Sequence, residues 1–137
     1  MTDVDKNVRY VFLLESKNNR ILQAYAKKAD DEGYKEISKI FRLLSATSTI
    51  IAENCLEFIE QIGSTSNNLE HALVVSNKKR IRYKKLLDEC EKIGQKEIAS
   101  LFSRALTVEE KNRKLINQTI ENLENNVFET KIYLICR

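Results

Sequence analysis

Polar residues interrupt the apolar stripes of this chain, each near the middle of a predicted helix. They are Glu15, Ser48, Ser76, Lys79 or Arg80, Glu109 and Asn112. In an antiparallel bundle, interruptions at mid-helix meet at about the same height. A buried carboxylate costs several kcal/mol unless it is paired or binds a metal. Two glutamates at one level therefore require a counter-charge, either a metal ion or a basic side chain.

A repeated stretch defines the elements that position these residues. The segment 33–41 (Gly-Tyr-Lys-Glu-Ile-Ser-Lys-Ile-Phe) returns 61 residues later as 94–102 (Gly-Gln-Lys-Glu-Ile-Ala-Ser-Leu-Phe). Each copy has a glycine that ends one helix and a Lys-Glu-Ile…Phe run that starts the next. The repeat predicts two helical hairpins in tandem. The same offset pairs the interruptions: Glu15 with Ser76, Ser48 with Glu109, and Ile51 with Asn112.

Apolar residues at steps of three and four predict two long helices in the first half. The first runs over about 4–29, with Thr2 or Asp3 as its cap. The second follows the first repeated glycine and ends at Ile62, with Gly63 as its C-terminal glycine.

The second half repeats the plan. Asn67 and Glu70 predict a capping box for the third helix, which ends at Gly94. The fourth helix ends near Asn125. The tail 127–137 alternates weakly and is expected to form a short strand or an extended segment.

Composition agrees with an all-α protein. The 137 residues contain no proline and three glycines, which excludes most turn-rich β folds. We predict one helical domain over 1–126, followed by a tail over 127–137. The three cysteines, Cys55, Cys90 and Cys136, are widely spaced and predict reduced thiols of a cytoplasmic protein. No signal-peptide pattern or bilayer-spanning apolar run is found in the sequence, so no membrane partner is expected.

Short motifs in both hairpins follow one known family. They are Glu15-Ser16 with Arg20, Tyr25-Ala26-Lys27, Glu32-Gly33-Tyr34, Glu36-Ile37, Ile40-Phe41, Asn68-Leu69, Lys96-Glu97-Ile98-Ala99, Phe102 and Glu109. Over about residues 8–128 the chain resembles the rubrerythrin branch of the ferritin-like proteins. The tail resembles the lead into that family's rubredoxin domain but stops after one cysteine. The resemblance implies a ferritin-like four-helix bundle.

The family binds two irons through a Glu on helices 1 and 3 and a Glu-x-x-His on helices 2 and 4. It typically reduces peroxide, in an NADH-linked reaction, with electrons relayed through the rubredoxin iron. Carried over to this sequence, the ligand positions of the family fall on Glu15, Ser48, Ile51, Ser76, Glu109 and Asn112. A second glutamate that is common on helix 3 of the family falls on Lys79. Only Glu15 and Glu109 keep a carboxylate, and His71, the sole histidine, matches no ligand. A one-residue shift in helix 3 would give Val75 and Lys78 instead. The resemblance therefore implies a degenerate di-iron site with no expected metal.

Three arrangements could replace the irons. In the favoured one, the ammonium of Lys79 (or Lys78) pairs with Glu15 and Glu109 as an internal ion cluster, because two unpaired glutamates would repel each other. In the second, Lys79 reaches solvent and Glu15 is protonated or hydrogen-bonded to Ser48, Ser76 or Asn112. In the third, a residual metal binds.

The short middle connection constrains the assembly. Ferritin-like bundles run helices 2 and 3 parallel, but the predicted turn over 63–67 stretches only about 17 Å, against helices about 40 Å long. The chain is thus either a plain up-down-up-down bundle or a dimer that exchanges hairpins. The resemblance favours a domain-swapped homodimer, since relatives with a short Gly-x-Thr-x-x-Asn-Leu turn of this kind swap hairpins.

We interpret the chain as a non-catalytic dimeric scaffold or binding protein, with no cofactor and an unidentified protein partner. The alternative is an iron-binding protein with a peroxide-reducing, oxidative-stress role at Glu15 and Glu109, together with Glu53 or Glu110. The basic run 77–85 does not favour nucleic acid, because acidic residues follow it at 88, 89 and 91.

Overall fold

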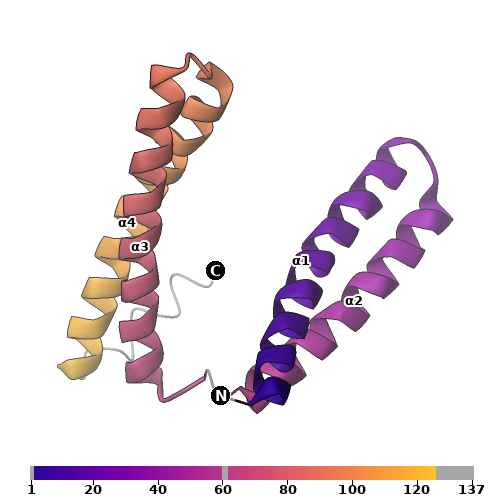
Figure 1. Cartoon of the computed structure of the whole chain (residues 1–137), viewed down its shortest axis with the longest axis horizontal. Coiled ribbons are helices and arrows are strands. Elements are labelled where there is room, and N and C mark those ends of the chain that lie inside the picture. Colours follow the sequence, from indigo (N-terminus) through magenta and orange to yellow (C-terminus); the bar gives the residue numbers. More distant parts are fainter. Residues whose placement is uncertain (1, 60–61, 126–137) are drawn as a thin grey trace. The chain divides into compact units, whose positions relative to one another are not determined.

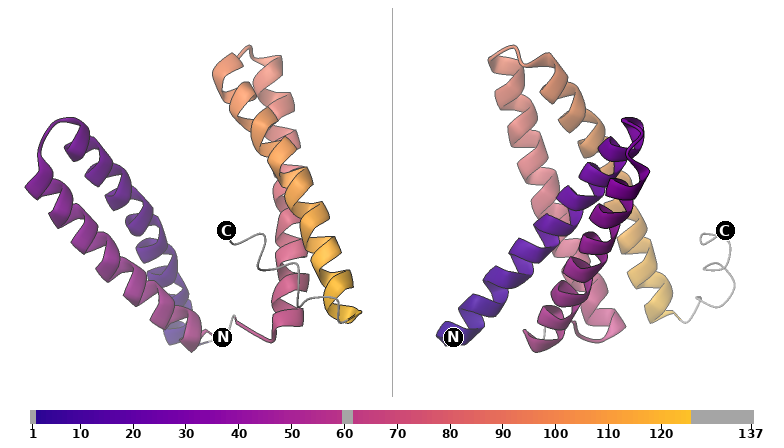
Figure 2. Two further views of the ribbon diagram at one scale, coloured as in Figure 1. Left: turned by 180° about the vertical axis from the view of Figure 1, so that it is seen from behind. Right: turned by 90° about the vertical axis from the view of Figure 1, so that its right-hand side faces the viewer.

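The computed structural model describes residues 2–59 and 62–125, which form four α-helices (Figure 1). They are α1 (Asp3–Asp31), α2 (Lys35–Phe58), α3 (Thr65–Lys92) and α4 (Lys96–Glu124). The chain divides into two compact units, Met1–Ile62 and Gly63–Arg137. In each unit the two helices lie side by side (Figure 2), α1 against α2 and α3 against α4. The prediction of an all-α fold made of two tandem hairpins is confirmed.

The two repeated glycines end α1 and α3 in the same way. Gly33 and Gly94 have φ of 85° and 74°, the left-handed conformation that glycine adopts without steric cost. The amide of the residue that follows each glycine donates a hydrogen bond back into the helix, to the carbonyl of Ala29 (2.8 Å) or of Cys90 (2.9 Å). This is the Schellman arrangement, which satisfies carbonyl groups at the end of a helix. The sequence repeat therefore corresponds to a repeated helix-ending geometry.

The connection between α2 and α3 differs from the prediction. The end of α2 at Ile62 and the capping box at Asn67 are wrong: α2 stops at Phe58, and α3 begins at Thr65. The Ser64 hydroxyl caps α3 by accepting a hydrogen bond from the Asn67 amide (3.2 Å). Asn68 donates to the Gly63 carbonyl (3.1 Å) and accepts from its amide (2.8 Å). Gly63 thus belongs to the entry of α3 and does not end α2 in the left-handed conformation.

Small side chains line the contact between α1 and α2. Its buried residues are Leu22, Ala26, Ala29, Ser38, Ser45, Ser48 and Ala52. The second hairpin buries Leu87, Cys90 and Ala99 beside Phe102 and Leu106, and it also buries Ser76 and Glu109. Small residues allow two helix backbones to approach closely, which brings polar groups on α1 and α2 within hydrogen-bonding distance.

Each hairpin leaves one apolar flank exposed. Ile37, Leu44 and Ile51 lie along one flank of α2, and Ile98 and Leu101 lie on the corresponding flank of α4. A pair of helices cannot bury such flanks alone, whereas a four-helix bundle covers them with a second hairpin. Among the described helices, none combines the length and the apolar character needed to cross a bilayer. The expected tail structure at 127–137 and Cys136 lie outside the described residues.

Candidate functional site

Lys79 on α3 forms an ion pair with Glu109 on α4. The lysine Nζ lies 2.7 Å from the Glu109 Oε2 atom. The Glu109 side chain is only 5% exposed, whereas that of Lys79 is 42% exposed. The lysine therefore brings a charge to a carboxylate that water scarcely reaches, while its own stem runs to the surface. Lys78, the alternative in the one-residue shift, is exposed.

The ion pair sets the charge state of both groups. Burial acts to raise the pKa of Glu109, but the hydrogen bond from Lys79 and the lysine charge, helped by Ser76 and Asn112, outweigh it and hold that pKa below its ordinary value. The hydrogen bond to Glu109 raises the pKa of Lys79, against a smaller effect of burial. Both groups are therefore charged at neutral pH.

A cavity of about 450 Å³ opens beside this pair within the second hairpin. Its lining includes Ser76, Lys79, Glu109 and Asn112, together with His71. The Ser76 hydroxyl is buried and has no hydrogen-bond partner of normal geometry among the described residues. The second hairpin thus brings together four of the predicted positions, and it places His71 at the same cavity.

The first hairpin has a neutral contact at the equivalent place. The Asn18 side-chain amide donates to the buried Ser48 hydroxyl (3.1 Å). Asn19 donates to the carbonyl and the hydroxyl of Ser45 (both 3.0 Å) and to the hydroxyl of Thr49. The Ser48 hydroxyl is therefore already engaged by an amide within its own hairpin.

These contacts obey the 61-residue offset of the sequence. The Asn18–Ser48 contact of the first hairpin corresponds to the Lys79–Glu109 contact of the second. Likewise, the Asn19–Thr49 contact corresponds to the Arg80–Glu110 contact. Each joins residues 30 positions apart. Reasoning from the sequence missed Asn18 and Asn19, although the offset applied to Lys79 and Arg80 would have found them. Glu110, named there as a further iron-binding carboxylate, instead lies beside Arg80. The two hairpins thus share one framework, neutral in the first and ionic in the second.

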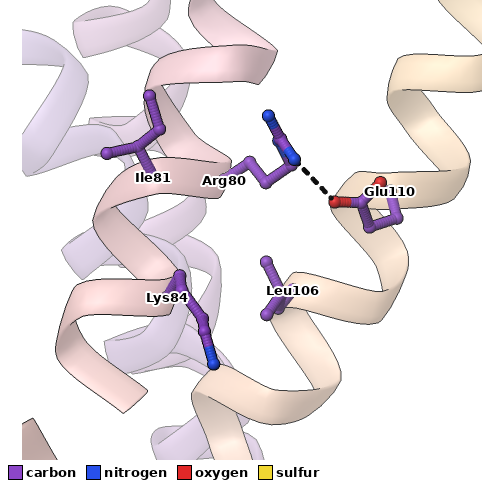
Figure 3. Close-up of a pocket in the computed structure, with 5 residues that line it drawn as sticks. All are labelled: Arg80, Ile81, Lys84, Leu106 and Glu110. Carbon is purple, nitrogen blue, oxygen red and sulfur yellow. Dashed lines mark hydrogen bonds and ion pairs between the residues drawn. The ribbon is translucent and has the colours of Figure 1, made fainter. Parts of the chain in front are cut away.

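A second ion pair involves the residues that follow Lys79 and Glu109 in the sequence, Arg80 and Glu110. The Arg80 Nη1 atom is 3.4 Å from the Glu110 Oε1 atom, the contact drawn as a dashed line in Figure 3. Arg113 Nη2 is 3.3 Å from Glu110 Oε2. A cavity of about 410 Å³, lined also by Ile81, Lys84 and Leu106, opens here. The Glu110 side chain is about a third exposed, so water screens its ion pairs more than it screens the Lys79–Glu109 pair. Its contacts with the two arginines are also longer than the Lys79–Glu109 contact.

Two predicted positions stay outside the ion pair. Glu15 lies half-buried on α1 and has no hydrogen bond or ion pair among the described residues. Ile51 lies on the exposed apolar flank of α2. The contact of Glu15 with the Lys79–Glu109 pair remains a prediction.

The donor set does not fit a di-iron centre. Such centres need carboxylates together with imidazoles. Here Glu109 accepts a hydrogen bond from an ammonium, Ser48 accepts one from an amide, and Ile51 has no donor atom. Within residues 2–59 and 62–125, His, Cys, Asp and Glu side chains form no group of three or more able to hold a metal.

Two tandem helical hairpins with polar residues at mid-helix define a ferritin-like four-helix-bundle protein. The family model described as Rubrerythrin matches residues 6–123, most of the chain. The chain therefore belongs to the rubrerythrin family. No curated protein matches it significantly in sequence.

Proposed function

We propose that this rubrerythrin-family chain has exchanged its metal centre for an internal ion cluster of Glu15, Lys79 and Glu109, and acts as a non-catalytic dimeric scaffold or binding protein. The observation that carries the proposal is the 2.7 Å bond between the Lys79 ammonium and the buried Glu109 carboxylate. A fixed ammonium replaces part of the positive charge that irons supply in the family, and it cannot change oxidation state.

Glu15 completes the cluster when a first hairpin packs on a second one. Its carboxylate lies at mid-helix on α1, as Glu109 does on α4. The pairing of Lys79 with two carboxylates leaves one net negative charge, which the hydroxyl of Ser76 and the amide of Asn112 are suited to solvate. The Ser76 hydroxyl supports this arrangement, because it lies close enough to lower the pKa of Glu109 but makes no hydrogen bond of normal geometry among the described residues.

A metal titration tests the loss of the centre. Purified protein titrated without oxygen with Fe(II), and separately with Mn(II), is expected to show no stoichiometric binding by calorimetry. Exposure to air should then give no oxo-bridged iron absorption band. Stoichiometric binding with that band would overturn the ion cluster. It would favour the second candidate, an iron-dependent peroxide-reducing protein that uses the retained carboxylates of Glu15 and Glu109, and a peroxide-consumption assay would then measure that activity.

The proposed dimer exchanges hairpins. The connection from Phe58 to Thr65 spans at most about 25 Å, whereas α2 alone is about 36 Å long. The parallel run of helices 2 and 3 in a ferritin-like bundle is therefore out of reach within one chain. A partner chain can supply the second hairpin and cover the exposed flank of Ile37, Leu44 and Ile51.

Cross-linking distinguishes this dimer from a monomeric bundle. In a variant with the native cysteines replaced by serine, Glu15→Cys and Asn112→Cys place one thiol on each hairpin at the level of the polar layer. A short bismaleimide is expected to join two chains into a covalent dimer, because each bundle combines hairpins of different chains. Cross-links confined to single chains, with a monomeric mass by light scattering, would overturn the exchange. Chains with only one of the two cysteines are the control.

The free thiols and the charge balance support the remaining assignments, a cytoplasmic location and a protein partner. Cys55 and Cys90 are free thiols, which supports a reducing cytoplasm. The partner of a scaffold is expected to be a protein, since the basic stretch of α3 is offset by ion pairs such as Lys84–Asp88 (3.2 Å).

A further inference from the structure

The groove beside Arg80 and Glu110 offers more hydrogen-bond donors than the protein itself uses. Figure 3 shows Arg80 and Lys84 extending from α3, and Glu110 from α4, around this groove. The Nε–H groups of Arg80 and Arg113 are buried, and neither has a hydrogen-bond partner among the described residues. Burying a donor without a partner destabilises a protein, so two such groups beside one carboxylate indicate that they serve a ligand.

Positive charge exceeds negative charge in this groove. Three cations, Arg80, Lys84 and Arg113, lie around the Glu110 carboxylate, which is bonded to the two arginines at 3.4 and 3.3 Å. These contacts are longer than the roughly 2.7–2.9 Å of a strong charge-assisted hydrogen bond. Lys84 also pairs with Asp88 (3.2 Å), but both side chains are largely exposed, so water screens that pair. Glu110 therefore holds the arginines loosely and leaves an excess of positive charge.

The repeat provides a neutral reference for this groove. The 61-residue offset places Asn19, Gln23, Thr49 and Ala52 where the second hairpin has Arg80, Lys84, Glu110 and Arg113. Gln23 donates to Asn19 (3.0 Å), Asn19 donates to Thr49, and Ala52 is buried. The nearby Arg20 is exposed and bonded to Gln23 of its own helix (3.1 Å). Because neutral side chains complete the helix contact at these positions, packing does not require the three cations of the second hairpin.

The groove lies on the opposite flank of α3 from the cavity beside Lys79. Val75 and Lys79 line that cavity. With about 3.6 residues per turn, Arg80 and Lys84 lie roughly 140° around the helix axis from them. The Lys79 flank carries the ligand positions of the family and faces the interior of a ferritin-like bundle, so the groove stays on the outside whichever chain supplies the first hairpin. The inference therefore depends neither on the ion cluster nor on the exchange of hairpins.

We propose that this groove binds the phosphate group of a small phosphomonoester. Such a group carries close to two negative charges at neutral pH and three acceptor oxygens, whereas Glu110 carries one charge. The guanidinium groups of Arg80 and Arg113 and the ammonium of Lys84 bind the phosphate oxygens, and the ligand displaces the Glu110 carboxylate. The cavity of about 410 Å³ has the size of an organic ligand site, and Ile81 and Leu106 provide apolar surface for the organic part.

Isothermal titration calorimetry with phenyl phosphate, at neutral pH and low salt, tests this site. The wild-type protein is expected to bind one phenyl phosphate per chain, and to bind it more tightly than inorganic phosphate, which has no apolar part. Arg80→Gln and Arg113→Gln are each expected to weaken binding about tenfold, because each removes charge-assisted hydrogen bonds to the phosphate. The matched control is K78Q/K111Q, which removes two exposed charges from other faces of the same helices and should bind like the wild type.

Replacing Glu110 is expected to change the affinity in the opposite direction. Glu110→Gln removes the carboxylate that competes with the ligand, so it should tighten phenyl phosphate binding about tenfold. Misfolding does not produce such a gain, and far-UV circular dichroism checks that all variants stay helical. Weaker binding in Glu110→Gln would overturn the competition by Glu110.

Three results would overturn the phosphomonoester site itself. They are the absence of saturable phenyl phosphate binding, equal losses in K78Q/K111Q and in the arginine variants, and equal affinity for phenyl phosphate and inorganic phosphate. Failure of the ion cluster or of the exchanged dimer would instead appear in the metal titration or the cross-linking, with phenyl phosphate binding intact.

Discussion

Replacing Lys79 with methionine is expected to lower the free energy of unfolding by about 2 kcal/mol. The substitution keeps the apolar stem but removes the only cation bonded to Glu109 among the described residues. Breaking a buried pair by removing one partner typically costs about 3–5 kcal/mol, and the partial exposure of Lys79 reduces that range. Urea unfolding at neutral pH measures the change. Lys78→Met, on the exposed side of the same turn, is the matched control and should change little.

A double-mutant cycle assigns this loss to the pair. Glu109→Gln removes the buried charge and should cost less than Lys79→Met, because the freed ammonium can still reach water. The double variant Lys79→Met/Glu109→Gln is expected to be more stable than Lys79→Met alone, since no uncompensated charge remains. Equal effects of Lys79→Met and Lys78→Met would contradict the role assigned to the pair.

The same pair determines how stability depends on pH. Because the folded pKa of Glu109 lies below its ordinary value, its contribution is complete above the unfolded pKa of 4.5 and disappears as the pH falls through the folded value. The contribution of Lys79, whose pKa is raised, is complete below 10.5 and is lost as the pH rises through its folded value. In Lys79→Met, the raising effect of burial on the pKa of Glu109 is opposed only by Ser76 and Asn112, so that pKa is higher than in the wild type. The stability difference between the wild type and this variant should therefore shrink as the pH falls, first through the Glu109 pKa of the variant and then through the lower Glu109 pKa of the wild type.

Substituting Ala26 with leucine is expected to cost about 3 kcal/mol. Ala26 is 0% exposed, in the contact where small residues bring α1 and α2 together. A leucine has no room there and must push the helices apart, an overpacking that typically costs about 1–3 kcal/mol. Separation of the helices would also break the nearby hydrogen bond between Asn18 and Ser48.

Ala24→Leu provides the control for that result. Ala24 lies on the same helix but is exposed, so the change in helix propensity is the same without any change in packing. It should alter the free energy of unfolding by less than about 0.5 kcal/mol. Urea unfolding of both variants measures the difference, and similar losses in the two would show that the α1–α2 contact is loosely packed.

Several features of the fold could be predicted because they depend on local interactions. A glycine in the left-handed conformation ends a helix within one turn, so Gly33 and Gly94 marked two helix ends correctly. The connection between α2 and α3 was harder, since Ser64 and Asn67 are both good caps and only one can begin the helix. The hydrogen bonds of Asn68 with Gly63 favour the earlier start. Competing caps of similar strength leave such a boundary undecided in a sequence.

The sequence by itself determined the two hairpins and their family, because the repeated motif and the helix-ending glycines can be identified within a few residues. Only the tertiary structure decided that Lys79 bonds to Glu109 and that Asn18 bonds to Ser48. Helix phase states which face a residue lies on, but its partner across the interface depends on how far one helix slides along the other. The packing of small side chains between α1 and α2, and of larger ones between α3 and α4, sets that register.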